Sequence, residues 1–367
     1  MHDDRKAWVD GRAGTRACIR RGLSAGLTLL TLACSSVEPA KAPDAAHGDA
    51  ANEEDAGALD AGESSCGSSS ETLSACVDKE RLRADVEFVA KPRVPGSAHW
   101  QAVQDLCAER FAAYGFDVER HRYSTGVNVI GTRRGADKPD EQVIISAHYD
   151  HIADCPGADD NATGVAAVLE TARVLKGIKL ERTLLLACWD EEERGLIGAL
   201  AYAARARERG DKIIAMTSLE MIGYKSDAPN SQKIPTGFDV LFPQQHAAVA
   251  ANQFRGDFVS LVGLDTAAPL SEAFVQRAKQ AGLPSSLITL TRDMATNPLL
   301  SDLSRSDHAA FWLQGFPSLL VTDSSNFRYA QYHCRNGDDV PSLLSFDFLT
   351  DVTRASVAAH LDVLGLK

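Results

Sequence analysis

The sequence predicts an α/β fold in which a mixed, largely parallel β-sheet is covered by helices on both faces. Short apolar runs rich in Val, Ile and Leu alternate along the chain with segments whose apolar residues recur at helical spacing. No second linker and no internal repeat interrupts this alternation after Val77. Because repeated strand–helix units build one sheet, we expect a single domain, residues 77–367.

Each predicted strand is a short apolar run that is joined to the next one through a helical segment or a turn. Strands are expected at residues 126–132, 142–147, 182–189, 212–220, 257–262, 285–290 and 318–322. Helices are expected at residues 81–89, 100–114, 162–176, 196–209, 271–281, 307–313 and 343–364. Gly115 and Gly210 follow two of these helices, where glycine commonly ends a helix.

The first part of the chain has the features of an export signal. Residues 1–33 combine a basic start with an apolar stretch that is too short to span a bilayer comfortably. Small residues before Cys34 resemble a bacterial lipoprotein cleavage site, so we expect a cell-envelope lipoprotein attached to the membrane through a lipidated Cys34. Plain secretion and an uncleaved anchor are the alternatives. Residues 34–76 are rich in Ala, Asp, Gly and Ser and predict a disordered acidic tether.

The charge of the chain bears on its binding partners, and its cysteines bear on whether it forms disulfides. The net charge of −12 argues against nucleic acid as a partner. An even set of cysteines in an exported chain permits disulfides without revealing their connectivity; beyond Cys34 the set is Cys66, Cys76, Cys107, Cys155, Cys188 and Cys334. Cys155 and Cys334 could join the loops that hold them. Cys188 lies inside an apolar run, which is compatible with a buried thiol.

Acidic and imidazole side chains stand where apolar runs stop. His148 and Asp150 follow one run, Glu192 and Glu193 follow the next, and Glu220 ends a third. In an α/β fold the carboxyl ends of buried strands are where ligands bind. A mixture of imidazole and carboxylate suits zinc better than calcium, which prefers oxygen ligands alone.

Taken singly, these residues have ordinary structural explanations. Asp159 or Asn161 could cap the helix that follows them, and a lone loop histidine such as His333 is most often solvated. The three adjacent carboxylates 191–193 are harder to explain, because burying such groups is unfavourable unless something cationic is present.

Taken together, the residues form a series of motifs that resembles the M28 family of zinc aminopeptidases. The motifs, in chain order, are His148-x-Asp150, Gly157-Ala-Asp-Asp-Asn-Ala-Thr-Gly164, Glu192-Glu-Arg-Gly-Leu-Ile-Gly198, Glu220-Met-Ile-Gly223, Ser306-Asp-His308 and Tyr332-His333. The resemblance extends from about Pro92 to the C-terminus and includes an early loop at residues 92–97. It implies a zinc-exopeptidase-like fold and removal of N-terminal residues from peptides.

The resemblance also implies a role for each site residue. Two zinc ions are expected per chain, with Asp160 bridging them, His148 and Glu220 binding one, and Glu193 and His333 binding the other. Glu192 is expected to be the general base, Asp150 to orient His148, and Tyr332 to polarise the substrate carbonyl. The peptide bond between Asp160 and Asn161 is expected to be cis.

Two details depart from the family or leave a choice open. Glu220 stands where many members have Asp, and its longer side chain could shift or weaken that zinc. The register of the acidic run selects Glu192 and Glu193, leaving Glu191 out. Ser306, Asp307 and His308 suggest a serine-hydrolase triad, but contiguous residues cannot easily form one.

The remaining expectations concern partners and alternative functions. The acidic site suits peptides that carry a free N-terminal ammonium group, and we expect a monomer. One alternative is a glutaminyl cyclase-like transferase that works with a single zinc. The other is a non-catalytic binding module on the same fold.

Overall fold

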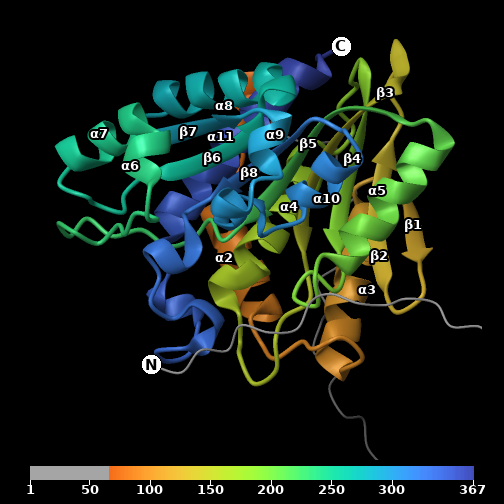
Figure 1. Cartoon of the computed structure of the whole chain (residues 1–367). Coiled ribbons are helices and arrows are strands. Elements are labelled where there is room, and N and C mark those ends of the chain that lie inside the picture. The colour runs from red at the N-terminus through yellow and green to blue at the C-terminus, as the bar shows by residue number, and fades with distance from the viewer. Residues whose placement is uncertain (1–65) are drawn as a thin grey trace, which may run out of the picture. The chain divides into compact units, whose positions relative to one another are not determined.

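An eight-stranded sheet forms the centre of the computed structural model, which describes residues 66–367 (Figure 1). The strand order is β1-β2-β4-β3-β5-β8-β6-β7. The strands are β1 (Asp117–Arg122), β2 (Val127–Arg133), β3 (Lys138–His148), β4 (Arg182–Trp189), β5 (Lys212–Glu220), β6 (Val259–Leu264), β7 (Ser285–Leu290) and β8 (Ser318–Thr322). The expected signal peptide and residues 34–65 of the expected tether lie outside the described residues.

The central strands run parallel, which confirms the predicted sheet type. β4, β3, β5 and β8 are parallel neighbours, while β2 and β1 add to one side in antiparallel pairs. On the other side β6 pairs antiparallel with β8 and parallel with β7. His148 lies opposite Trp189 at the ends of β3 and β4, and Glu220 lies opposite Thr322 at the ends of β5 and β8. The carboxyl ends of four strands therefore share one edge.

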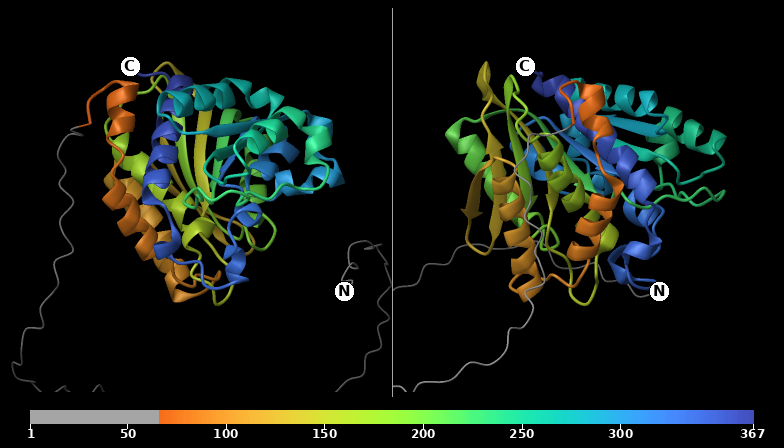
Figure 2. Two further views of the ribbon diagram at one scale, coloured as in Figure 1. Left: turned by 90° about the vertical axis from the view of Figure 1, so that its left-hand side faces the viewer. Right: turned by 180° about the vertical axis from the view of Figure 1, so that it is seen from behind.

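Helices cover both faces of the sheet (Figure 2). The α-helices are α1 (Ser70–Ala75), α2 (Lys79–Val89), α3 (Ala98–Ala113), α4 (Gly164–Val174), α5 (Ile197–Arg209), α6 (Phe238–Leu241), α7 (Pro243–Ala251), α8 (Ala268–Gln280), α9 (Arg292–Ala295), α10 (His308–Leu313) and α11 (Phe346–Leu364). Among the described residues, no helix is both long enough and apolar enough to cross a membrane.

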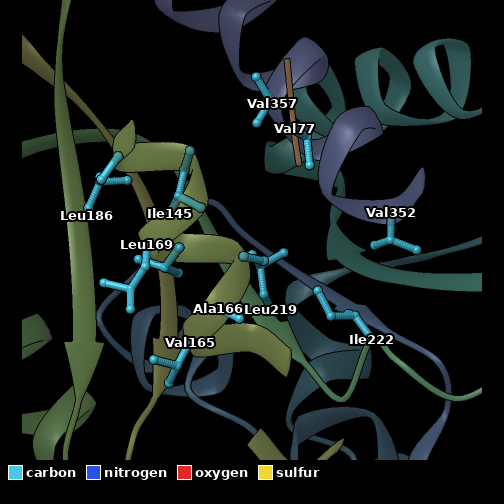
Figure 3. Close-up of a cluster of buried hydrophobic side chains, with 14 of the residues drawn as sticks. Val77, Ile145, Val165, Ala166, Leu169, Leu186, Leu219, Ile222, Val352 and Val357 are labelled. Carbon is cyan, nitrogen blue, oxygen red and sulfur yellow. The ribbon is translucent and has the colours of Figure 1, made fainter. Parts of the chain in front are cut away.

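Alternate residues of the central strands point to opposite faces, and both faces are buried. Ile145 packs with Val165 and Leu169 of α4 in the larger core cluster (Figure 3). The next residue back, Ile144, packs in a second cluster with Tyr202 of α5. Burial on both faces explains why these strands read as continuous apolar runs in the sequence.

The folded region begins before residue 77, so the expected end of the tether is wrong. Helix α1 buries Leu73 in the main core, and a disulfide joins Cys66 to Cys76. Leu73 is the one large apolar side chain among residues 66–76, so the segment does not stand out from the polar composition before it. Leu73 packs α1 against the core, Arg173 donates a hydrogen bond to the backbone oxygen of Cys76, and the disulfide closes the segment on itself.

Four other elements were not predicted: the four-residue helices α6 and α9, the strand β1 and the helix α7. β1 is an edge strand with sequence Asp-Val-Glu-Arg-His-Arg, and its Val118 is exposed, so it lacks an alternating apolar face. Helix α7 buries one residue, Val249, and therefore lacks the apolar stripe of a core helix.

Three disulfides join the six cysteines of the described region. Cys155 pairs with Cys334, as the sequence analysis allowed, and Cys66 pairs with Cys76. The interpretation of Cys188 as a buried thiol is wrong, because it pairs with Cys107 and ties β4 to α3. The partner could not be found from the sequence because the two residues are 81 positions apart.

Replacing Cys107 and Cys188 by Ala is expected to lower the free energy of unfolding by about 2–5 kcal/mol, because the disulfide restricts a long loop of the unfolded chain. The same replacement of Cys66 and Cys76, which are only 10 positions apart, is expected to have a smaller effect. Urea denaturation of both double variants measures the difference. An equal or larger loss at Cys66–Cys76 would contradict the expectation.

Candidate metal centre

The predicted site residues meet at the carboxyl edge of the sheet, where β3, β4 and β5 end. His148 is the last residue of β3 and Glu220 the last of β5. Glu193 follows β4 in a turn, and Asp160 lies just before α4. His333 lies in a loop near the C-terminal end of the chain. Segments far apart in the sequence therefore supply one cluster.

The first group of ligand-type atoms comprises His148, Asp160 and Glu220. The Nε2 atom of His148 lies 3.3 Å from Oδ1 of Asp160 and 3.3 Å from Oε2 of Glu220. Two ligands of a tetrahedral zinc ion, each about 2.0–2.1 Å from the metal, lie roughly 3.3 Å apart. The spacing of this group therefore fits a zinc ion.

The second group shares Asp160 with the first. The Nε2 atom of His333 lies 3.3 Å from Oδ2 of Asp160 and 3.1 Å from Oε2 of Glu193. One oxygen of Asp160 thus faces His148 and the other faces His333. A carboxylate placed in this way can bridge two cations.

Unpartnered buried atoms provide an independent sign that cations belong here. Nε2 of His148, Oε1 of Glu193 and both ring nitrogens of His151 are buried without a hydrogen bond. Buried polar atoms are rarely left in this state unless an ion or ordered water completes them. The residues present therefore fit a centre for two divalent ions.

Asp150 contacts both the histidine and the glutamate pair. Its backbone oxygen lies 3.2 Å from Nδ1 of His148, and its carboxylate lies 3.5 Å from the same atom. The carboxylate also accepts backbone N–H bonds from Glu192 at 3.0 Å and Glu193 at 3.3 Å. Asp150 therefore holds the turn that carries the glutamates as well as the ring of His148.

The pKa values of Glu192 and Glu193 are shifted in opposite directions. Burial, together with the carboxylates of Glu220 and Asp307, raises the pKa of Glu192 well above its usual range. Burial and Asp160 also oppose ionisation of Glu193, but His151 and His333 outweigh them and lower its pKa. Glu193 is thus suited to remain a carboxylate, and Glu192 to take up a proton.

The structure separates Glu191 from the site. Glu191 is buried, pairs with Arg194 at 2.8 Å and accepts a hydrogen bond from Thr125. The register that selects Glu192 and Glu193 therefore agrees with the placement of the three side chains.

Ser306, Asp307 and His308 do not form a triad. Ser306 donates a hydrogen bond to Oε2 of Glu220 at 2.8 Å. Asp307 is buried with both carboxylate oxygens unpartnered, and Nε2 of His308 contacts the backbone oxygen of Leu303 at 3.0 Å. The serine therefore holds Glu220, and the histidine supports its own loop.

Tyr332 lies beside the second group. Its ring stacks on His333 with centroids 3.8 Å apart, and its hydroxyl accepts a hydrogen bond from Arg305 at 3.0 Å. Burial raises the pKa of Tyr332, so the hydroxyl keeps its proton at neutral pH.

A fully buried arginine shapes the loop that carries Asp160. Arg93 donates to the backbone oxygens of Tyr149 at 3.0 Å, Gly157 at 2.9 Å and Asp160 at 3.0 Å. These bonds connect the end of β3 with the turn before α4. The peptide bond from Asp160 to Asn161 is cis, as the resemblance implied.

A buried acid fixes the same loop from the other side. The Asp339 carboxylate accepts backbone N–H bonds from Asp159 and Asp160 at 3.0–3.1 Å, and it accepts the hydroxyl of Tyr329 at 2.9 Å. The Cys155–Cys334 disulfide adds a covalent link between the two loops. The loop of His333 and the loop of Asp160 are therefore joined by hydrogen bonds and by a disulfide.

His151 is a site residue that the sequence analysis missed. It lies directly after His148-x-Asp150 and is placed among Glu193, Asp160 and His333. A second histidine three residues after a metal-ligand candidate was the signal available in the sequence, but its position on the chain does not reveal which way the ring points.

An apolar pocket opens onto the site. Asp160, Glu192, Glu220 and His333 line one end. Apolar side chains line much of the rest, among them Ile234, Phe238, Phe258, Val262, Ile288 and Leu320, and the charged residues Lys233, Asp302 and Arg305 also contribute. Such a pocket can receive an apolar side chain next to the carboxylates.

Comparisons with known proteins agree with this fold. The model of peptidase family M28 matches residues 128–359. The uncharacterized protein YfbL of Escherichia coli (strain K12) is 33% identical over 220 residues, covering 56% of this chain and 62% of YfbL. A probable zinc metalloprotease of Leptosphaeria maculans is 27% identical over 235 residues, covering 60% of this chain and 52% of the relative. The matches thus span less than two thirds of these relatives.

Solved structures share the architecture. An aminopeptidase from Aneurinibacillus sp. strain AM-1 superposes with a TM-score of 0.61 at 16% identity, covering 82% of this chain and 97% of that one. The glutaminyl cyclase of Fimbriiglobus ruber superposes with a TM-score of 0.52 at 16% identity, covering 77% and 95%. The fold is therefore of the zinc-exopeptidase-like class. The family match across residues 128–359 is more specific: the chain belongs to peptidase family M28.

Replacing Arg93 by Leu is expected to lower the free energy of unfolding by roughly 3–5 kcal/mol, because buried carbonyls and carboxylates lose their cationic partner. Urea denaturation measures the loss, and Arg134→Leu, at an exposed arginine, serves as the control. Equal stability of the two variants would show that the Arg93 bonds do not hold the loop.

Proposed function

We propose that the protein is a zinc-dependent aminopeptidase that removes apolar residues from the N-terminus of peptides. The observation that carries the proposal is the division of the Asp160 carboxylate between two imidazole–carboxylate groups at the end of an apolar pocket. Relatives described as zinc metalloproteases support the choice of metal and of reaction.

In this proposal His148 and Glu220 hold one zinc ion, Glu193 and His333 hold the other, and Asp160 bridges them. Bound zinc supplies a Lewis acid that polarises the peptide carbonyl and activates water for attack. The carboxylates around Asp160 attract the free ammonium group of the substrate, which favours an aminopeptidase over a carboxypeptidase.

Glu192 is proposed to carry the proton. It removes a proton from the attacking water and delivers it to the amine that leaves. The Tyr332 hydroxyl, which keeps its own proton, donates to the oxygen that becomes negative during attack.

Location outside the cytoplasm is part of the proposal. Three disulfides link the described cysteines, and disulfides persist mainly in oxidising compartments. Lipid attachment at Cys34 and a monomeric state stay predictions.

Glutaminyl cyclase activity is the second candidate, because the fold is shared with such an enzyme. The complete second group, Glu193 and His333 facing Oδ2 of Asp160, favours the two-metal peptidase. Incubation with a peptide that begins with glutamine separates the two: release of free glutamine supports the peptidase, and pyroglutamate formation supports the cyclase. A non-catalytic module would do neither.

The Glu192→Gln variant is expected to bind about two zinc ions, as the wild type does, and to lose several orders of magnitude in kcat, because only the proton carrier is removed. Metal analysis and hydrolysis of leucine p-nitroanilide measure the two properties. The matched control is Glu191→Gln, which changes the neighbouring acid that pairs with Arg194. Near wild-type turnover by Glu192→Gln would rule out the assigned base.

The substrate preference follows from the lining of the pocket. Leucyl and phenylalanyl p-nitroanilides are expected to have kcat/KM values at least about tenfold above those of glutamyl and lysyl p-nitroanilides, because an apolar side chain packs against residues such as Phe238, Phe258 and Ile288, whereas a charged one loses its hydration on entering the pocket. A chelator is expected to abolish all four activities, and zinc to restore them. Preference for a charged residue would contradict the role given to the pocket.

A further inference from the structure

His151 is a buried imidazole to which the proposed mechanism gives no task. The residue is 1% exposed, Nε2 has no hydrogen-bond partner, and the acids that Nδ1 approaches are Glu193 and Asp160. Its backbone N–H donates to the backbone oxygen of Arg93 at 3.3 Å, which fixes the main chain beside the site. Burying a polar ring without hydrogen-bond partners is unfavourable, so such a ring requires a functional explanation.

The ring of His151 faces the oxygen of Glu193 that the second metal group does not use. Nδ1 of His151 lies 2.7 Å from Oε1 of Glu193 and 3.9 Å from Oδ1 of Asp160. The other oxygen of Glu193, Oε2, faces His333 at 3.1 Å. The two imidazoles meet edge to face with centroids 6.0 Å apart, so Glu193 lies between two histidines.

The neighbouring loop leaves room for this ring. Gly157 has a φ of +62°, and a Cβ atom at this position would lie 2.5 Å from Cδ2 of His151. Any larger residue at 157 would therefore displace the imidazole or the loop. The close approach of Gly157 defines where the His151 ring lies.

We propose that His151 is a positioning residue for Glu193. By holding Oε1, it prevents rotation of the carboxylate and keeps Oε2 directed at the position shared with His333 and Asp160. Partners that orient a metal-binding side chain typically change metal affinity by roughly 10–100-fold. The proposal rests on the proposed two-zinc site and assigns His151 to the ion held by Glu193.

Two amide substitutions separate positioning by Nδ1 from other roles. The amide nitrogen of His151→Asn occupies about the place of Nδ1, whereas that of His151→Gln reaches toward the place of Nε2. Zinc affinity is measured by competition with a chromophoric chelator, without reference to activity. His121→Gln on β1, at the edge of the sheet, is the control for loss of a buried histidine.

The expected result is that wild type, His121→Gln and His151→Asn bind two zinc ions with affinities within about threefold of one another. His151→Gln is expected to bind one ion as the wild type does and the other roughly 10–100-fold more weakly. Circular dichroism checks that each variant is folded. If His151→Gln does not fold, His151→Ser, which also removes the nitrogen, is tested by the same criterion.

Two outcomes overturn the inference. Wild-type affinity for both ions in His151→Gln would show that Glu193 needs no such partner. A loss in His151→Asn as large as in His151→Gln would make the imidazole itself a ligand. A wild-type protein that binds fewer than two ions would instead count against the proposed function, so the two failures are distinguishable.

Discussion

The structure depends on burying several carboxylates at one edge of the sheet, where like charges repel and water is excluded. The acids that converge there are Asp160, Glu192, Glu193, Glu220 and Asp307. Burial of unpaired carboxylates is strongly unfavourable. Three histidines, His148, His151 and His333, lie among these five acids, so imidazole charge alone cannot balance them, and the arrangement makes physical sense as a receptor for divalent cations.

The loop that carries Asp160 is held by hydrogen bonds from its backbone to two buried charged side chains. The guanidinium of Arg93 donates hydrogen bonds to carbonyl oxygens of this loop, and the carboxylate of Asp339 accepts hydrogen bonds from its amide N–H groups. Opposite charges thus hold neighbouring peptide groups of the same loop. The disulfide from Cys155 to Cys334 then fixes the distance between this loop and the one that carries His333.

The sequence predicted what depends on long apolar runs and on local spacing. The central strands, buried on both faces, and the acids at their ends followed from patterns within a few residues. β1 and α7 were not predicted because packing and sheet pairing, rather than an apolar face, hold them in place. The partner of Cys188 and the direction of the His151 ring depend on residues distant in the chain, so no local pattern contains them.

The glutamate at position 220 illustrates how local geometry decides the effect of a departure from the family. A longer side chain should be less well fixed than aspartate. Here Ser306 donates to Oε2 of Glu220, and Ser218 contacts Ser306 at 3.0 Å, so a chain of hydroxyls from β5 holds the carboxylate. The same oxygen lies 3.3 Å from His148. The additional methylene is therefore accommodated by directing the carboxylate back toward the histidine, which preserves the spacing that a zinc ion requires.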